Sequence, residues 1–194
     1  ITLKNKKALE QVQLCLGVPA PPVDHPDRYA VYLLNTILGG GMSSRLFQTI
    51  REDQGLAYSI FSEMNPFRDT GALSVYAGTS VDKTEKLIRL TLDEFRRIKQ
   101  DPVSADELKR AKDQLKGNIL MGLESSNSRM ANLARQELYF QQFFTAEEII
   151  AWIDAVTAEQ IQTMAQNLFN IDRIAVTLRG RLDGIKLNRK RLVC

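Results

Sequence analysis

The sequence predicts an α+β fold with a mixed, largely antiparallel sheet and helices packed on one face. Strand and helix patterns follow one another in the order β-α-α-β-β, and a run of helices and a closing strand complete the chain. Strands grouped in this way, with the helices segregated from them, are typical of the α+β class. No linker-like composition interrupts the 194 residues. We therefore expect one domain over residues 1–181, followed by a basic tail over residues 182–194.

Alternation of apolar and polar residues marks the expected strands. They cover residues 8–18, 56–64, 72–78 and 173–178. The prolines at positions 19, 21 and 22 are expected to end the first of them. The two middle strands flank a turn-rich segment over residues 65–71, which predicts an antiparallel pair with a long connection.

Apolar residues at helical spacing mark the expected helices. In the first helix, Asp24 is expected at the N-cap and Pro26 in the first turn, and Gly55 is expected to follow the last turn of the second. Capping-box patterns mark three later helix starts, namely Ser104 with Glu107, Thr145 with Glu148, and Thr157 with Gln160. The remaining predicted helices cover residues 26–38, 43–54, the segment from 82 onward, and 128–139.

Composition excludes several classes of function. The formal net charge is +3, which is too small to indicate a nucleic-acid surface or a membrane surface. The basic clusters lack interleaved aromatic residues on which bases would stack. No apolar run approaches the length of roughly 20 residues that spans a bilayer. We therefore expect neither a nucleic-acid partner nor a membrane partner.

Histidine and cysteine are scarce. The chain has one histidine, His25, and two cysteines, Cys15 and Cys194. Zinc sites take three or four His, Cys or carboxylate ligands, so we expect no metal site in this chain. Cys15 is expected to be a small buried residue and Cys194 a frayed end. Two cysteines form no disulfide framework, which favours a bacterial cytoplasm, with the periplasm or the mitochondrial matrix as alternatives.

Two segments are candidates for chemistry. Gly39, Gly40 and Gly41 form a run that is compatible with a hinge between helices, a mobile loop facing a peptide groove, or a phosphate-binding loop, although no Gly-Lys-Ser/Thr follows. Arg51 lies near the end of a predicted helix and Tyr58 near the start of a predicted strand. A guanidinium and a phenol on one rim would donate hydrogen bonds to a carbonyl or to the oxyanion formed from it. The alternative is that both are ordinary structural residues.

Three features together resemble the insulinase-like zinc metallopeptidases, also called the M16 or pitrilysin family. They are the strand QVQLCLGVPA, the helix after Asp24, and the segment LGGGMSSRLFQTIREDQGLAYSIFS. The likeness runs from about residue 8 to residue 180. It implies a domain with the metallohydrolase fold shared by LuxS and the mitochondrial processing peptidases. Members of the family pair two homologous halves, of which one carries an inverted His-x-x-Glu-His zinc motif.

This sequence has no His-x-x-Glu-His motif and therefore resembles the second, non-zinc half. The resemblance implies that Arg51 and Tyr58, seven residues apart, assist catalysis and bind substrate in a zinc endopeptidase that cleaves extended peptides. It implies, more weakly, that Gly39, Gly40 and Gly41 contact substrate. Zinc and the general base would come from a homologous half, on the same polypeptide or on a separate subunit. This half alone is expected to be inactive.

Two alternatives to a peptidase stay open. In the first, the parent protein is a catalytically inactive scaffolding subunit of the same family. In the second, the chain is a phosphate-binding or nucleotide-binding module that uses the glycine run. The first residue is Ile1 rather than methionine, so we expect the chain to be part of a longer protein. A homodimer of the fragment is a further possible assembly.

Overall fold

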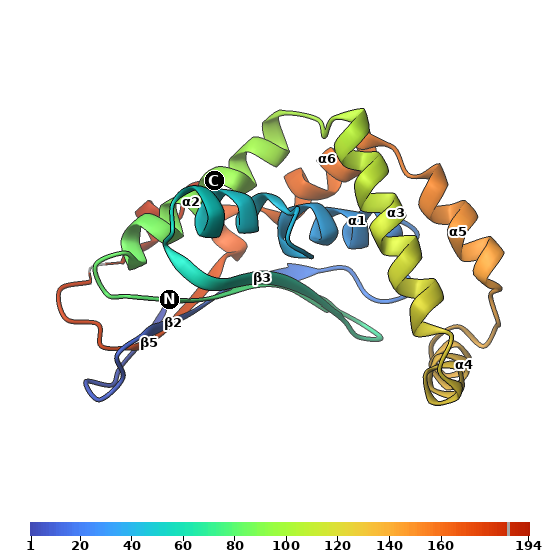
Figure 1. The fold of residues 1–194 in the computed structure, drawn as a ribbon, viewed down its shortest axis with the longest axis horizontal. Helices are drawn as coiled ribbons and strands as arrows, with labels where there is room; N and C mark the ends of the chain where they lie inside the picture. The colour runs from blue at the N-terminus through green and yellow to red at the C-terminus, as the bar shows by residue number, and fades with distance from the viewer. Residues whose placement is uncertain (186) are drawn as a thin grey trace.

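The computed structural model describes residues 1–185 and 187–194 and contains two layers, a curved sheet and helices on its convex side (Figure 1). Within these residues the strands are β1 (Thr2–Asn5), β2 (Val12–Ala20), β3 (Ala57–Pro66), β4 (Gly71–Thr79) and β5 (Ala175–Gly180). Their spatial order is β1-β5-β2-β4-β3. β1 pairs with β5 in parallel, whereas β2 pairs with β4 and β5, and β3 with β4, in the antiparallel sense. The predicted α+β class is confirmed.

Three strands differ from the prediction. β5 lies over Ala175–Gly180 instead of 173–178, because residues 171–173 form a 3₁₀ turn. β1 was not predicted, because its exposed residues show no alternation and its order comes from backbone pairing with β5. β2 lies over Val12–Ala20 instead of 8–18, and it includes Pro19. The ladder with β5 ends at Gly17, so Pro19 has only β4 as a neighbour. A proline is tolerated there because one side of the strand needs no hydrogen-bond donor.

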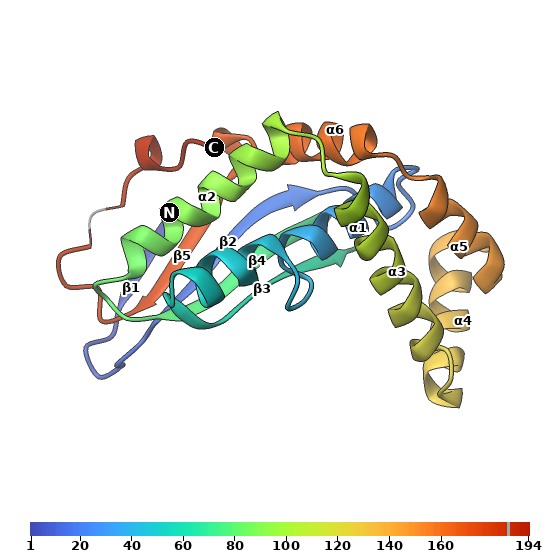
Figure 2. The same ribbon diagram turned by 45° about the horizontal axis from the view of Figure 1, so that its top comes forward.

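The helices form the second layer and extend beyond the strands at one end (Figure 2). They are α1 (Arg28–Gly39), η1 (Phe47–Asp53), α2 (Thr84–Gln100), α3 (Ala105–Gly122), α4 (Ser126–Phe140), α5 (Ala146–Ala155), α6 (Ala158–Leu168), and the short 3₁₀ turns η2 (Ile171–Arg173) and η3 (Arg189–Arg191). α1 packs against β3, α3 and α6, whereas α4 and α5 lie at the end of the molecule beyond the strands.

Two of the three predicted capping boxes are confirmed, at Thr145 and Thr157. Ser104 caps α3 as predicted, but the carboxylate of Glu107 binds Arg45 instead of closing the box. The start of α1 also differs, because the residue at its N-cap is Asp27 rather than Asp24. The preceding residues form a turn in which the Nδ1 atom of His25 accepts a hydrogen bond from the Asp27 N–H at 3.1 Å.

The hydrophobic core lies between the sheet and the helix layer. Leu14 and Leu16 on β2 are buried and face the helices. The alternation of a strand therefore points Cys15 toward the bare face, where it is half-buried instead of buried as expected. In the same core, the rings of Phe95 on α2 and Phe169 after α6 stack with their centroids 4.0 Å apart.

The described part of the predicted tail packs against the domain. Leu182 and Leu192 are buried, and Arg189 donates to the carbonyl oxygens of Ile171 and Ile174 at 2.7 and 2.9 Å. The expectation of a frayed Cys194 is wrong, because its carbonyl oxygen accepts a 2.6 Å hydrogen bond from Lys99. Position 186 of this tail lies outside the described residues, and the domain boundary at residue 181 stays a prediction.

Candidate functional site

The segment between α1 and β3 has an unusual backbone. Its predicted helix over residues 43–54 contains two α-helical residues, Arg45 and Leu46, and then the π-helix η1. π-Helical winding is rare and is frequent at functional sites, because the wider turn reorients side chains that an α-helix would direct elsewhere. Arg51 lies in this π-helix.

Two polar contacts anchor η1 to neighbouring helices. Arg45, just before it, donates two hydrogen bonds to the carboxylate of Glu107 on α3, at 2.8 and 2.7 Å. Thr49 donates to the carboxylate of Glu94 on α2 at 3.1 Å, and Glu94 is 2% exposed. Arg97 pairs with the same oxygen of Glu94 at 2.8 Å, which compensates the buried charge. The π-helix is thus held on both sides.

A left-handed glycine and a β-bulge follow η1. Gly55 has φ = 55°, and the N–H of Leu56 donates to the carbonyl of Ile50 at 2.9 Å, which confirms the predicted helix end. In the ladder between β3 and β4, Ala57 pairs with Thr79 and Ser59 with Gly78, which leaves Tyr58 as the extra residue. A bulge re-aims a side chain, and the Tyr58 side chain is 83% exposed.

These irregularities bring Arg51 and Tyr58 together. The Cζ atom of Arg51 lies 4.8 Å from the centroid of the Tyr58 ring and 4.7 Å from that of Phe47. Its Nε atom is 3.6 Å from a carboxylate oxygen of Glu52. Contact with two aromatic rings restrains a guanidinium while its N–H edge stays able to donate. Phe47 was not among the predicted site residues, although its position four residues before Arg51 on a predicted helix indicates that the two side chains are neighbours.

The glycine run borders the same site. Gly39, Gly40 and Gly41 line a hollow of about 350 Å³ together with Phe47 and Arg51, and with residues 59–62 of β3. Tyr58 is not among the residues that line this hollow, although its ring contacts Arg51.

Packing explains at least one of these glycines. A Cβ at Gly39 would lie 2.5 Å from the backbone nitrogen of Ser62. The Gly40 N–H donates to Thr36, and the carbonyl of Gly41 accepts from Ser44. These backbone groups lie at the C-terminal end of α1, where the helix dipole is negative and repels a phosphate. This position disfavours the nucleotide-binding alternative.

The donors in the described part of the chain do not fit a zinc site. They include no group of three or more His, Cys, Asp or Glu side chains that would hold a metal ion. His25 uses its Nδ1 atom within the turn before α1. None of the helices in residues 1–185 and 187–194 has both the length and the apolar character needed to cross a bilayer.

Comparison with known proteins gives relatives along most of the chain. A sequence profile described as the peptidase M16 inactive domain matches residues 1–115. The uncharacterized zinc protease YmxG of Bacillus subtilis is 39% identical over 170 residues, which cover 88% of this chain and 42% of that protein. An uncharacterized zinc protease of Mycobacterium leprae is 41% identical over 166 residues, covering 86% of this chain and 37% of that protein. The chain thus spans about two fifths of the length of these relatives.

Solved structures share the fold. The peptidase M16 inactive domain from Pseudomonas fluorescens superposes with a TM-score of 0.84 at 26% identity, over 96% of this chain and 44% of that chain. A chain of complex III from Candida albicans superposes with a TM-score of 0.87 over all of this chain and 49% of its own length. Its identity of 18% supports the fold alone. The sequence match, the architecture and the named relatives agree, and the chain therefore belongs to the peptidase M16 family, as its inactive domain.

Proposed function

We propose that this chain is the substrate-binding half of a zinc-dependent endopeptidase that cleaves extended peptides. In this proposal Arg51 and Tyr58 hold the substrate and stabilise the intermediate. Zinc and the general base come from a homologous half, on the same polypeptide or on a separate subunit. Relatives named as zinc proteases, of which this chain covers about two fifths, support a parent protein with a second part.

The observation that carries the proposal is the convergence of two backbone irregularities on one pair of side chains. The π-helix η1 carries Arg51, and the bulge in β3 carries Tyr58. Ordinary α-helix and β-ladder geometry would be more stable for the backbone, so such departures persist where surrounding contacts enforce them. The contacts of Arg45 and Thr49 with α3 and α2 supply that enforcement.

The pair has the chemistry that peptide hydrolysis requires. Attack on a peptide carbonyl places negative charge on its oxygen, and preorganised donors stabilise that charge more than they stabilise the substrate. The guanidinium of Arg51 and the phenol of Tyr58 are such donors. The hollow beside Arg51, lined by the glycine run and by β3, offers space for the backbone of an extended peptide.

This assignment predicts that the 194-residue chain by itself cleaves nothing, because its described residues hold no metal-binding group and its sequence no His-x-x-Glu-His motif. An unstructured fluorogenic peptide incubated with the chain is expected to stay intact, with or without added zinc. Addition of the zinc-bearing half, or use of the complete protein, is expected to give cleavage that a chelator abolishes.

Metal-dependent hydrolysis by the chain alone would contradict this assignment. A complete protein that binds unfolded peptide but never cleaves it would favour the inactive scaffolding subunit.

A further inference from the structure

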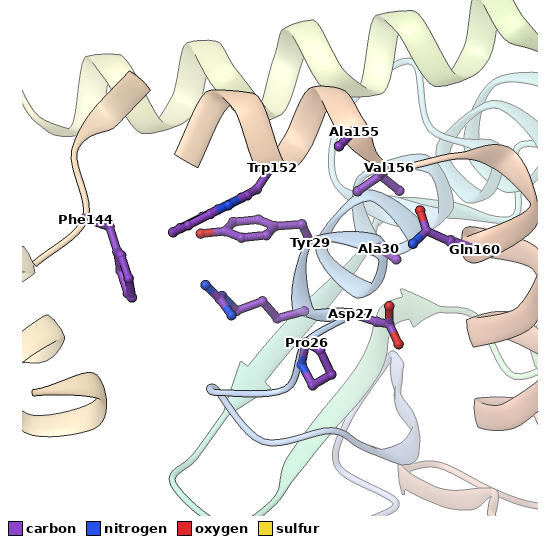
Figure 3. A pocket seen from close by; sticks show the side chains of 10 residues that line it. Pro26, Asp27, Tyr29, Ala30, Phe144, Trp152, Ala155, Val156 and Gln160 are labelled. Carbon is purple, nitrogen blue, oxygen red and sulfur yellow. The ribbon is translucent and has the colours of Figure 1, made fainter. Parts of the chain in front are cut away.

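A second group of side chains, far from Arg51, surrounds Arg28 at the start of α1. The Cζ atom of Arg28 lies 4.7 Å from the ring centroid of Tyr29, 5.4 Å from that of Trp152 and 5.3 Å from that of Phe140. Phe144 is 5.9 Å away. Figure 3 shows the rings of Tyr29 and Trp152 side by side, with Phe144 across from them. Residues from α1, α4, α5 and the α4–α5 loop therefore meet at this guanidinium.

Two cavities adjoin this group. One, of about 310 Å³, lies between α1, α5 and α6 and is the cavity drawn in Figure 3. The other, of about 470 Å³, lies between α1, α4 and the hairpin formed by β3 and β4. Arg28, Tyr29 and Phe144 line both cavities, and Arg135 on α4 lines the larger one. Among the described residues, no aspartate or glutamate lines the larger cavity.

The two arginines have unused donors. Arg28 donates a 3.4 Å hydrogen bond to the carbonyl of His25 and interacts with the Tyr29 hydroxyl, and Arg135 donates a 3.3 Å bond to the carbonyl of Ala131. Within the described residues, no ion pair joins either arginine to a carboxylate. Each guanidinium has five N–H donors in a planar fork, which matches the two oxygens of a carboxylate.

The remaining lining combines neutral donors with apolar surface. Burial raises the pKa of Tyr29 and of Tyr32, against a smaller lowering by Arg28, so both phenols stay protonated at neutral pH. Phe67, Phe140 and Ile149 add apolar surface to the larger cavity. The site therefore suits a ligand that joins a negative charge to an apolar group.

We propose that the larger cavity binds a carboxylate of a peptide next to an apolar or aromatic side chain. The carboxylate comes from the C-terminus of that peptide or from an acidic residue in it. Arg28 and Arg135 pair with the carboxylate, and the aromatic rings cover the apolar side chain. The peptide identity of this ligand rests on the proposed function.

The position of the cavity sets a length for the substrate. α1 connects the two sites, with Arg28 at the cavity and Gly39 beside Arg51. These residues are 11 apart, which corresponds to ~17 Å of helix. β3, the strand at the edge of the sheet, also connects them, and Asn65 lies seven positions after Tyr58, which corresponds to ~23 Å of strand. An extended peptide would carry the recognised carboxylate about five to seven residues from the scissile bond.

Trp152, the sole tryptophan of the chain, lines the smaller cavity and lies against Tyr29 and Phe144, which line the larger one. Its fluorescence therefore reports binding in the larger cavity. The 194-residue chain is titrated with three probes, N-acetyl-phenylalanine, its amide, and N-acetyl-aspartyl-phenylalanine amide, and tryptophan fluorescence is recorded. We expect at least one acid to bind about tenfold or more tightly than the neutral amide. Binding of the first acid assigns the site to a chain terminus, and binding of the third probe assigns it to an acidic side chain.

A matched pair of variants tests the role of an arginine in carboxylate binding. Both variants keep Arg28, the residue at the centre of the aromatic group. Arg135→Gln is expected to weaken acid binding at least fivefold, whereas Arg129→Gln is expected to leave it unchanged. Both arginines lie exposed on α4 and donate to a backbone carbonyl, but Arg129 does not line the cavity.

The proposal would be overturned if neither acidic probe bound more tightly than the neutral amide. It would also be overturned if Arg135→Gln and Arg129→Gln had equal effects on the affinity for the acid. Because this assay involves no cleavage, its failure would leave the roles of Arg51 and Tyr58 untouched. Conversely, an inactive parent protein would leave the measured carboxylate binding valid.

Discussion

Arg51→Ala in the complete protein is expected to lower kcat/KM by at least about tenfold, toward the roughly 10²- to 10³-fold loss that follows removal of one oxyanion donor. Tyr58→Phe, which removes only a hydroxyl group, is expected to have an effect of the same kind. Both side chains face the same substrate oxygen in our proposal, so the double variant should lose less than the product of the single losses. Steady-state cleavage of an unstructured peptide gives kcat/KM for the two single variants and the double variant.

Two controls separate this role from a loss of fold or of charge. Arg110→Ala removes an exposed arginine of α3 that does not line the hollow beside Arg51, and it should leave kcat/KM unchanged. Arg51→Lys keeps the charge but loses the planar donor edge, so it should recover only part of the activity. Unchanged turnover in both Arg51→Ala and Tyr58→Phe would reduce the pair to structural residues.

Gly39→Ala is expected to destabilise the domain by about 1–3 kcal/mol, the usual range for overpacking a close contact. The added Cβ would lie 2.5 Å from the backbone nitrogen and 2.9 Å from the Cβ of Ser62. The hydroxyl of Ser62 is itself bonded to the Oδ1 atom of Asn35 at 2.8 Å, so it has no free direction in which to retreat. α1 would have to separate from β3. A decrease in Tm on the order of 5 °C, followed by circular dichroism, is the expected readout.

Gly117→Ala is the matched control for this variant. Gly117 lies inside α3, and a Cβ there would meet nothing within 4 Å. Because alanine has the higher helix propensity, this change should stabilise the domain by roughly 0.5–1 kcal/mol. A Gly39→Ala variant as stable as the wild type would mean that α1 and β3 tolerate a larger separation than their contact indicates.

The sequence predicted those structural features that depend on residues close together in the chain, such as helix caps and a hairpin. The capping boxes at Thr145 and Thr157, the left-handed Gly55, and the antiparallel pairing of β3 with β4 each depend on side chains a few positions apart. β1 was not predicted because its order depends on hydrogen bonds to β5, 175 residues later in the chain. Pro19 was misjudged for the same kind of reason, since its tolerance depends on where the ladder with β5 ends.

The fold class, the lack of a His-x-x-Glu-His motif and the choice of Arg51 and Tyr58 as candidates all follow from the order of the residues. The contact between these two side chains, in contrast, is a result of three-dimensional packing. Their approach depends on π-helical winding held by Glu107 and Glu94 and on a bulge set by β4. The environment of Arg28 depends likewise on rings from α4, α5 and their connecting loop. Such contacts join residues tens of positions apart, and no local pattern encodes them.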